Sequence, residues 1–439
     1  MKQCVYLLVV VPLFLAGSAA AQPWTAQRCM EYAVTHNHSV RQARLELDNY
    51  KAARRGAVGR FLPSLDASVG TQYNFGRAID PETNTYTDVS TFYNGYSVNA
   101  SLPVFDGFSR LHALKAAKAA VLMGRNALRQ QQDQTAISTL QAFADAAYYK
   151  GLVTMAEEKQ KEAGLLLRQT QLMEQVGRKS AADVAEVASQ KAEADYNLTR
   201  QQNLHAAALL ELKTVMGLPV TDSLEIIGTP PDHSQGEECL PLRNQFISHY
   251  SLLISHFRME VARHEWRQAH ASVLPALSVT AGLSTTYYKT LHSPMATPFT
   301  TQLQNNMGQY VGATLSIPIF NRLQSLTAIR RAKNNYRIAC EAYEEKRLEL
   351  LKLATQAAQD LHAYLLQTQQ MEKKVAADSL AYELTRRQYE EGLSTAIDLH
   401  TMSAQLLNSK ATLLQCQLMV MVKKQLVRYY NGEQIWTEE

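Results

Sequence analysis

The chain has 439 residues, 46% of them hydrophobic and 19% charged, which is enough for a large core and for more than one domain. Lysine and arginine total 44, aspartate and glutamate total 40, and a formal charge of +4 over this length excludes the strongly basic footprint of a nucleic-acid-binding protein. Beyond the N-terminus no run of 18 apolar residues occurs, so the sequence predicts no transmembrane helix.

The first 21 residues are typical of a secretory signal peptide. Lys2 precedes an apolar run from Val5 to Ala16, which is too short to span a bilayer, and Ala19 to Ala21 supply the small residues of a cleavage site. We therefore expect residues 1–21 to be removed. The mature protein would then lie in the periplasm, in an outer-membrane barrel or outside the cell.

Cysteine usage gives little support for metal binding. Four cysteines follow the signal segment, and none of them forms a C-x-x-C pair, which argues against a metal knuckle. Cys29 and Cys239 occupy nearly equivalent places in the two halves described next, so a disulfide between them is left open.

The sequence is internally duplicated. Three motifs each occur twice, the first pair 212 residues apart and the other two pairs 215 residues apart. They are FLPSLDASVG (61–70) with VLPALSVTAG (273–282), YSVNASLPVFDG (96–107) with VGATLSIPIFNR (311–322), and GRKSAADV (177–184) with GLSTAIDL (392–399). The change of three predicts exposed loops near 76–91 and 289–307, where insertions are tolerated.

The duplication divides the chain into two repeats. The ranges are the signal peptide 1–21, a first repeat 22–216, a linker 217–242, a second repeat 243–430 and a tail 431–439. The linker is rich in glycine and proline and holds SLEIIGT, for which we allow a short strand.

Each repeat has two segments with the alternation of a β-strand. These segments are about 63–75, 92–103, 275–288 and 308–318. In the first, Leu65, Val69 and Tyr73 share an apolar face, and small polar residues occupy the other. The length of about 10 residues fits a tilted outer-membrane strand, and a soluble β-sandwich is the alternative. Four strands cannot close a barrel alone, so two copies with eight strands or three with twelve are required.

The rest of each repeat is predicted to be helix. Residues 107–176 and 322–391 contain no proline, and at 70 residues each would extend roughly 105 Å. We expect Pro103 and Pro318 to end the strands, and Asp106 and Asn321 to cap the helices that follow. Further helices are expected at 24–60, 181–217, 244–272 and 396–430.

Gly177 and Gly392 mark the reversal of each long helix. Glycine readily adopts the left-handed conformation of such a turn. Ser180-x-x-Asp183 and Thr395-x-x-Asp398 then have the spacing of capping boxes that restart a helix. An alternative role is a gate, because copies of one aspartate around a symmetry axis would form a carboxylate ring that favours cations.

The order of these elements resembles that of a known family. Each repeat has a helix, an L-P-x-L strand, a loop, a strand ending in [LI]-P-[VI]-F, a long helix and a glycine-marked reversal. Over about residues 24–430 this order resembles the outer membrane efflux protein family. The resemblance implies a homotrimer whose twelve strands form one barrel in the outer membrane of a Gram-negative bacterium. It also implies a helical tunnel through the periplasm, with a periplasmic adaptor protein and an inner-membrane transporter as partners.

The resemblance assigns roles to residues at the helical tip. It implies that adaptor helices meet the channel near Gly177, Gly392, Arg178 and Ser394. It also implies that Asp398 lines the closed end.

Further gate candidates come from the same region. Asp183 is the counterpart of Asp398 in the first repeat, and Tyr389 agrees with the family's aromatic partner. The sequence departs from the family where Ser394 replaces an arginine lock and Thr401 replaces a second aspartate. We therefore expect a looser closed state, or one held by Arg178, Arg386 or Arg387.

The first helix departs from the family in another way. Family members often have Asn-Pro there, and this chain has Asn37-His38 and, in the second repeat, Tyr250-Ser251. This leaves the local bend open.

The expected function is a passive exit duct for efflux or secretion. No nucleophile motif, P-loop or supported carboxylate pair occurs, so we expect no enzyme, no cofactor and no metal site. The scattered histidines, including the neighbours His36 and His38, are interpreted as surface residues. The alternative is a structural periplasmic coiled coil or an adaptor protein without a pore. Paired amphipathic strands and a duplication argue against both.

Overall fold

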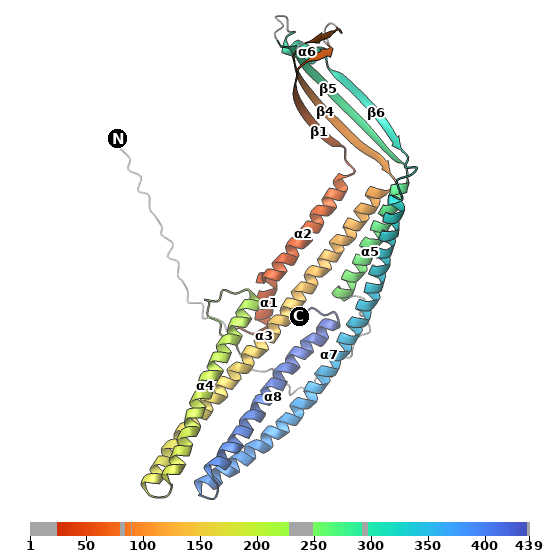
Figure 1. Cartoon of the computed structure of the whole chain (residues 1–439). Helices are drawn as coiled ribbons and strands as arrows, with labels where there is room; N and C mark the ends of the chain where they lie inside the picture. Colours follow the sequence, from red (N-terminus) through yellow and green to blue (C-terminus); the bar gives the residue numbers. More distant parts are fainter. Residues whose placement is uncertain (1–23, 80–83, 89, 228–248, 292–296, 437–439) are drawn as a thin grey trace, which may run out of the picture.

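The computed structural model describes residues 24–79, 84–88, 90–227, 249–291 and 297–436. The expected signal peptide, Cys239 and residues 437–439 of the tail lie outside these ranges. Figure 1 shows an elongated molecule with a curved sheet at one end, long helices below it, and two helical hairpins whose turns lie at the opposite end.

The first repeat contains the elements expected from its sequence. They are α1 (Ala26–His36), α2 (His38–Gly59), β1 (Ser64–Asn74), β4 (Thr91–Asp106), α3 (Ser109–Gln175) and α4 (Ala181–Met216). The second repeat follows the same order with α5 (Tyr250–His270), the short 3-10 helix η2 (Ala271–Val273), β5 (Ala276–Thr290), β6 (Gly308–Ser316), α7 (Gln324–Glu390) and α8 (Ala396–Tyr430). The expected class is confirmed, since the chain is mainly helical with one small antiparallel sheet and two similar halves.

The four long strands form one antiparallel sheet in the order β1-β4-β5-β6. Ser64 lies opposite Ser101 in the first repeat, and Ala276 lies opposite Ser316 in the second. These partners are related by the sequence offsets of 212 and 215 residues. The duplication therefore extends to the strand register, and β1 and β6 are left as the two edges of the sheet.

The strand-to-helix junctions differ from expectation. Pro103 does not end β4, which continues to Asp106 through a bulge between Pro103 and Phe105. A bulge tolerates proline because the ladder of hydrogen bonds is already interrupted there. Each long helix also starts later than expected, after a left-handed residue, Phe108 (φ 68°) or Leu323 (φ 63°), that makes no side-chain cap.

The expected capping residues nevertheless contact the first helical turn. Asp106 Oδ2 accepts a hydrogen bond from Arg110 N at 3.0 Å, and Asn321 Oδ1 accepts one from Ser325 N at 3.4 Å. Both reach across the two left-handed residues. The expected N-cap position was wrong, but both side chains still accept backbone N–H groups that the helix leaves unpaired.

The two expected loops contain short elements. Region 76–91 holds a small hairpin of β2 (Arg77–Ile79) and β3 (Tyr86–Asp88), and region 289–307 holds the helix α6 (Phe299–Asn305). Gln302 holds α6 to the sheet, because its amide accepts from Tyr288 N and donates to Tyr288 O, both at 2.8 Å. Residues 80–83, 89 and 292–296 of these regions are outside the described residues.

The bend in the first helix is present without proline. Asn37 interrupts the helix with ψ 138°, and its side chain accepts from Ser39 N at 2.7 Å and donates to Val215 O at 2.6 Å. His249 is the equivalent cap in the second repeat, since its Nδ1 accepts from Ser251 N at 3.3 Å. His249 is 3% exposed, so the interpretation of all histidines as surface residues was wrong, and burial lowers its pKa to about 4.

The largest core lies halfway along the helices, where α1, α3, α4 and α8 meet. Its fully buried side chains include Met30, Leu140, Leu212 and Met216. Cys29 is a free thiol in this core. Of SLEIIGT, only Ile226 pairs as a strand residue, in a single parallel bridge to Trp24. Within the described ranges, no helix has the length and apolar character needed to cross a membrane.

Candidate functional site

The turns of the two helical hairpins have the same backbone geometry. Gly177 (φ 73°) and Gly392 (φ 81°) adopt the left-handed conformation that the sequence predicted. In each turn the following residue closes a 6→1 hydrogen bond, from Arg178 N to Met173 O and from Leu393 N to Gln388 O, both 2.8 Å. A Cβ on either glycine would meet nothing within 4 Å, so only the backbone angle requires glycine here.

Both expected capping boxes are present. Asp183 N donates to Ser180 Oγ at 3.2 Å, and Asp398 N donates to Thr395 Oγ1 at 3.1 Å. The aspartate carboxylates accept in return from the N–H of Ser180 at 2.8 Å and of Thr395 at 3.1 Å. These hydrogen bonds favour the ionised form, so both carboxyls have a lowered pKa and carry negative charge at neutral pH.

Tyr389 joins the two hairpins. Its side chain is 3% exposed and belongs to a small apolar cluster with Val187 of α4 and Leu399 of α8. Its hydroxyl lies 3.4 Å from Thr170 Oγ1 on α3, and the ammonium of Lys179 lies 4.6 Å from the ring centroid. The aromatic residue singled out by sequence is therefore a link within one chain, between the end of α7 and the first hairpin.

The residues expected to replace the arginine lock do not converge on Tyr389. Ser394 donates to Asp398 Oδ2 at 3.3 Å, so it extends the cap of α8. Arg386 pairs with Glu390 on its own helix at 3.3 Å. Arg178 and Arg387 are exposed at the tip. Neither stands among the residues packed around Tyr389.

The structure adds contacts along the shaft that sequence reasoning missed. Lys159 on α3 donates to Ser403 on α8, and His400 of α8 lies 3.9 Å from Glu193 of α4. Gly151 lets Leu414 approach α3, because a Cβ there would lie 2.3 Å from Leu414 Cδ2. No signal in a single sequence pairs residues some 200 positions apart.

The sheet forms the opposite end of the molecule. The apolar face of β1 points to solvent in the isolated chain, where Leu65 and Val69 are about 70% exposed (73% and 69%). The small polar face carries cross-strand contacts such as Ser68 Oγ to Ser97 Oγ at 2.8 Å. Two-faced strands with open edges require further strands and an apolar surrounding to cover them.

No cofactor or metal site emerges from the part of the chain that the structure describes. No group of three or more histidine, cysteine, aspartate or glutamate side chains there is arranged to hold a metal ion.

Comparison with known proteins places these features in context. The family model described as outer membrane efflux protein matches residues 30–218 and 247–425. The chain is 23% identical over 423 residues to the outer membrane protein TolC of Escherichia coli K12, covering 93% of this chain and 82% of TolC. It is 21% identical over 378 residues to the outer membrane efflux protein BepC of Brucella suis, covering 83% and 76%.

Solved structures share the fold. A structure of CusC superposes with a TM-score of 0.79 at 14% identity, covering 93% of this chain and 92% of that one. The outer membrane protein VceC of Vibrio cholerae superposes with a TM-score of 0.77 at 14% identity, covering 93% and 96%.

Proposed function

Because this chain belongs to the outer membrane efflux protein family, we propose that it is the exit duct of a tripartite efflux or secretion system. The protein is an outer membrane channel of a Gram-negative bacterium and not an enzyme. In the proposal, an inner-membrane transporter supplies the energy and a periplasmic adaptor protein connects it to the duct. The duct itself is a passive conduit from the periplasm to the outside.

One observation carries this proposal. A four-stranded sheet with an outward apolar face and two open edges continues directly into two helices of 67 residues each. Open edges are not tolerated in lipid, so the sheet must close with other copies. Three copies give twelve strands, and the same symmetry surrounds a tunnel with the helices. A coiled coil or adaptor without a pore would leave the sheet without a role.

The two-repeat division belongs to the same proposal. Residues 22–216 and 243–430 would each supply two strands and one helical hairpin to the wall, with 217–242 as the linker between them. Residues 228–248 of that region are outside the described residues.

The hairpin tips are proposed as the gate and the docking end. Asp183 and Asp398 are ionised at neutral pH and lie at the ends of the hairpins, so threefold copies would form carboxylate rings at the entrance. Tyr389 would hold the hairpins of one protomer together in the closed state. The turns with Gly177, Gly392, Arg178 and Ser394 would meet the adaptor.

The test is the single-channel conductance of the purified protein in planar lipid bilayers. The proposal predicts a small, cation-selective conductance for the native protein, and for Asp398→Ala a conductance several times larger with weaker cation selectivity. Thr401→Ala, one turn further along α8, serves as the matched control and should leave both unchanged. No channel activity for any variant would contradict the duct. Unchanged conductance and selectivity for Asp398→Ala would contradict the gate alone.

A further inference from the structure

The two repeats end their second strand differently although the sequences match. β4 has 16 residues and runs to Asp106, whereas β6 has 9 residues and stops at Ser316. The segment LPVFD (102–106) of β4 corresponds, 215 residues later, to IPIFN (317–321), which is not a strand. The difference has an identifiable cause, because β5 pairs with the end of β4 and nothing pairs with 317–321.

Side-chain exposure follows the same division. Ile319 is 96% exposed, whereas its counterpart Val104 is 53% exposed. On the other edge of the sheet, Leu62 is 66% exposed, whereas its counterpart Leu274 is 40% exposed. The edge formed by β6 and the start of α7 and the edge formed by β1 and the end of α2 are therefore the uncovered counterparts of the joint between the two repeats.

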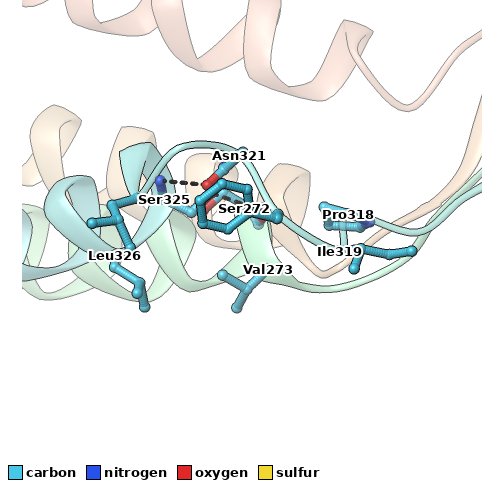
Figure 2. A pocket seen from close by; sticks show the side chains of 9 residues that line it. Ser272, Val273, Pro318, Ile319, Asn321, Ser325 and Leu326 are labelled. Atoms are coloured by element: carbon cyan, nitrogen blue, oxygen red, sulfur yellow. Dashed lines mark hydrogen bonds between the residues drawn. The ribbon is translucent and has the colours of Figure 1, made fainter.

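A pocket lies at the uncovered edge, where β6 leads into α7. Figure 2 shows it between η2 and the start of α7, lined by Ser272, Val273, Pro318, Ile319, Asn321 and Leu326 among others, with a hydrogen bond between Asn321 and Ser325. The same place in the first repeat is covered. A Cβ on Gly107 would lie 2.9 Å from Leu274 Cβ and 3.0 Å from Ala271 O.

We propose that β6 pairs with β1 of a second copy of this chain in the register that β4 and β5 use within the chain. Ala100 lies opposite Ala281 in that internal pair. Moving Ala100 forward by 215 positions gives Leu315, and moving Ala281 back by 212 positions gives Val69. Leu315 therefore lies opposite Val69 of the partner subunit. The pairing extends β6 through Pro318 to Asn321, with the bulge that β4 has after Pro103.

Two independent features support this register. The offsets used to derive it also convert the register of β1 and β4 into that of β5 and β6 without error. Leu315 and Val69 both belong to the apolar face of their strands, so the pair keeps that face continuous. A slip of one residue would turn the polar face of one strand toward lipid. The closest alternatives are slips of two residues, which keep the face but shift every partner.

The pocket in Figure 2 is then filled by Leu62 of the partner subunit, as Leu274 covers Gly107 within the chain. The joint between copies is wider at one point, because Arg322 stands where the internal joint has Gly107. The small residue is on the other side, where Gly59 corresponds to Ala271. This substitution offsets part of the added volume and leaves the strand register unchanged.

The inference rests on the proposed trimer and is tested by disulfide cross-linking in isolated outer membranes. The four cysteines of the mature chain are first replaced by alanine, and Leu315→Cys is combined with Val69→Cys. Directly opposite residues have Cα atoms about 4.5–5.5 Å apart, within disulfide range, whereas diagonal ones lie about 7–8 Å apart. Leu315→Cys with Thr71→Cys, and with Ala67→Cys, report the two slipped registers. Ala100→Cys with Ala281→Cys is the matched control inside one chain.

The expected result is a covalent trimer on a non-reducing gel, about tenfold more abundant for the Val69 pair than for either slipped pair. Equal or stronger linking of a slipped pair would overturn the register. So would a lack of linking for the Val69 pair while the internal control links fully. The mass of the unlinked protein in detergent separates the two levels. A trimer with another register overturns this inference alone, whereas a monomer overturns the proposed function as well.

Discussion

The two hairpin tips share their backbone and differ in the side chains that contact neighbouring hairpins. Both have a left-handed glycine and a capping box with the same hydrogen bonds. Tyr389 of the second hairpin is buried against the first, but 215 residues earlier stands Glu174, which is only half-buried. The contact that joins hairpins within a chain is therefore not repeated between chains. The duplication preserved what shapes each hairpin, while the joints between hairpins diverged.

The strand-to-helix junctions show the same division. Gly107 is buried in the joint between the repeats, and its counterpart Arg322 is exposed at the edge of the chain. Both are left-handed, with φ 65° and 57°. Their substitutions can therefore separate the cost of the backbone angle from the cost of close packing.

The largest effect is expected for Gly107→Ala. A left-handed alanine costs about 1–2 kcal/mol, and its Cβ would lie 2.9 Å from Leu274 Cβ, which forces the joint apart. Together with an overpacking cost of about 1–3 kcal/mol, we expect a loss of about 3 kcal/mol in the free energy of unfolding. Arg322→Ala is the matched variant, should cost less than about 0.5 kcal/mol, and both are compared by thermal unfolding in detergent. Equal losses would show that the joint between the repeats is not closely packed.

Tyr389→Ala is expected to have the next largest effect. Removal of a buried aromatic side chain at the end of a hairpin should cost about 2–3 kcal/mol, somewhat less than in a full core. The lost link should also raise single-channel conductance. Tyr389→Phe removes only the 3.4 Å hydroxyl contact to Thr170 and should keep most of the native behaviour. Glu174→Ala, at the unburied counterpart, should change stability little. A Tyr389→Ala channel with native conductance would contradict the role of this residue in the closed state.

The smallest of these effects concerns Asp133, a buried carboxylate on α3 whose counterpart Leu348 is exposed. Asp133 Oδ1 accepts from Trp436 Nε1 at 2.9 Å, and burial raises the pKa of the carboxyl from 3.8 to about 6 despite the opposing effects of Trp436 and Arg129. The folded state therefore holds the proton more tightly than the unfolded state, so Asp133 lowers stability as the pH rises from about 4 to 6.

Asp133→Asn keeps an acceptor for Trp436 and removes this titration. Relative to the native protein, the variant should gain about 2 kcal/mol between pH 4 and pH 7, since a full shift of two units would be worth about 3 kcal/mol before screening. Unfolding at both pH values measures the difference. A constant difference between the two proteins would show that Asp133 has an ordinary pKa.

Most of the fold could be predicted from the sequence, because its strongest signals are local. Alternation identified the strands, proline-free runs identified the helices, and Gly177 and Gly392 marked reversals whose return helices begin at the residues expected. Constant offsets between motifs anticipated the identical register of the two strand pairs. The prediction was less accurate where two non-glycine residues adopt left-handed angles at the start of each long helix, since no residue type there announces them.

The candidate site was predictable only in part. The capping boxes follow from a spacing of three residues, and Tyr389 was found through the resemblance. Its partners Thr170 and Lys179 lie more than 200 positions away and could not be paired with it from sequence. The caps by Asn37 and His249 were missed for a related reason, because their value depends on a helix break that neither residue type dictates.

The most direct test of the central claim is the mass of the protein extracted from membranes, measured by light scattering with correction for bound detergent. A trimeric duct predicts a particle of three chains, recovered from the outer-membrane fraction and stable only with detergent. A monomer or dimer that stays in solution without detergent would contradict it, because the sheet would then have no partner strands to close a barrel.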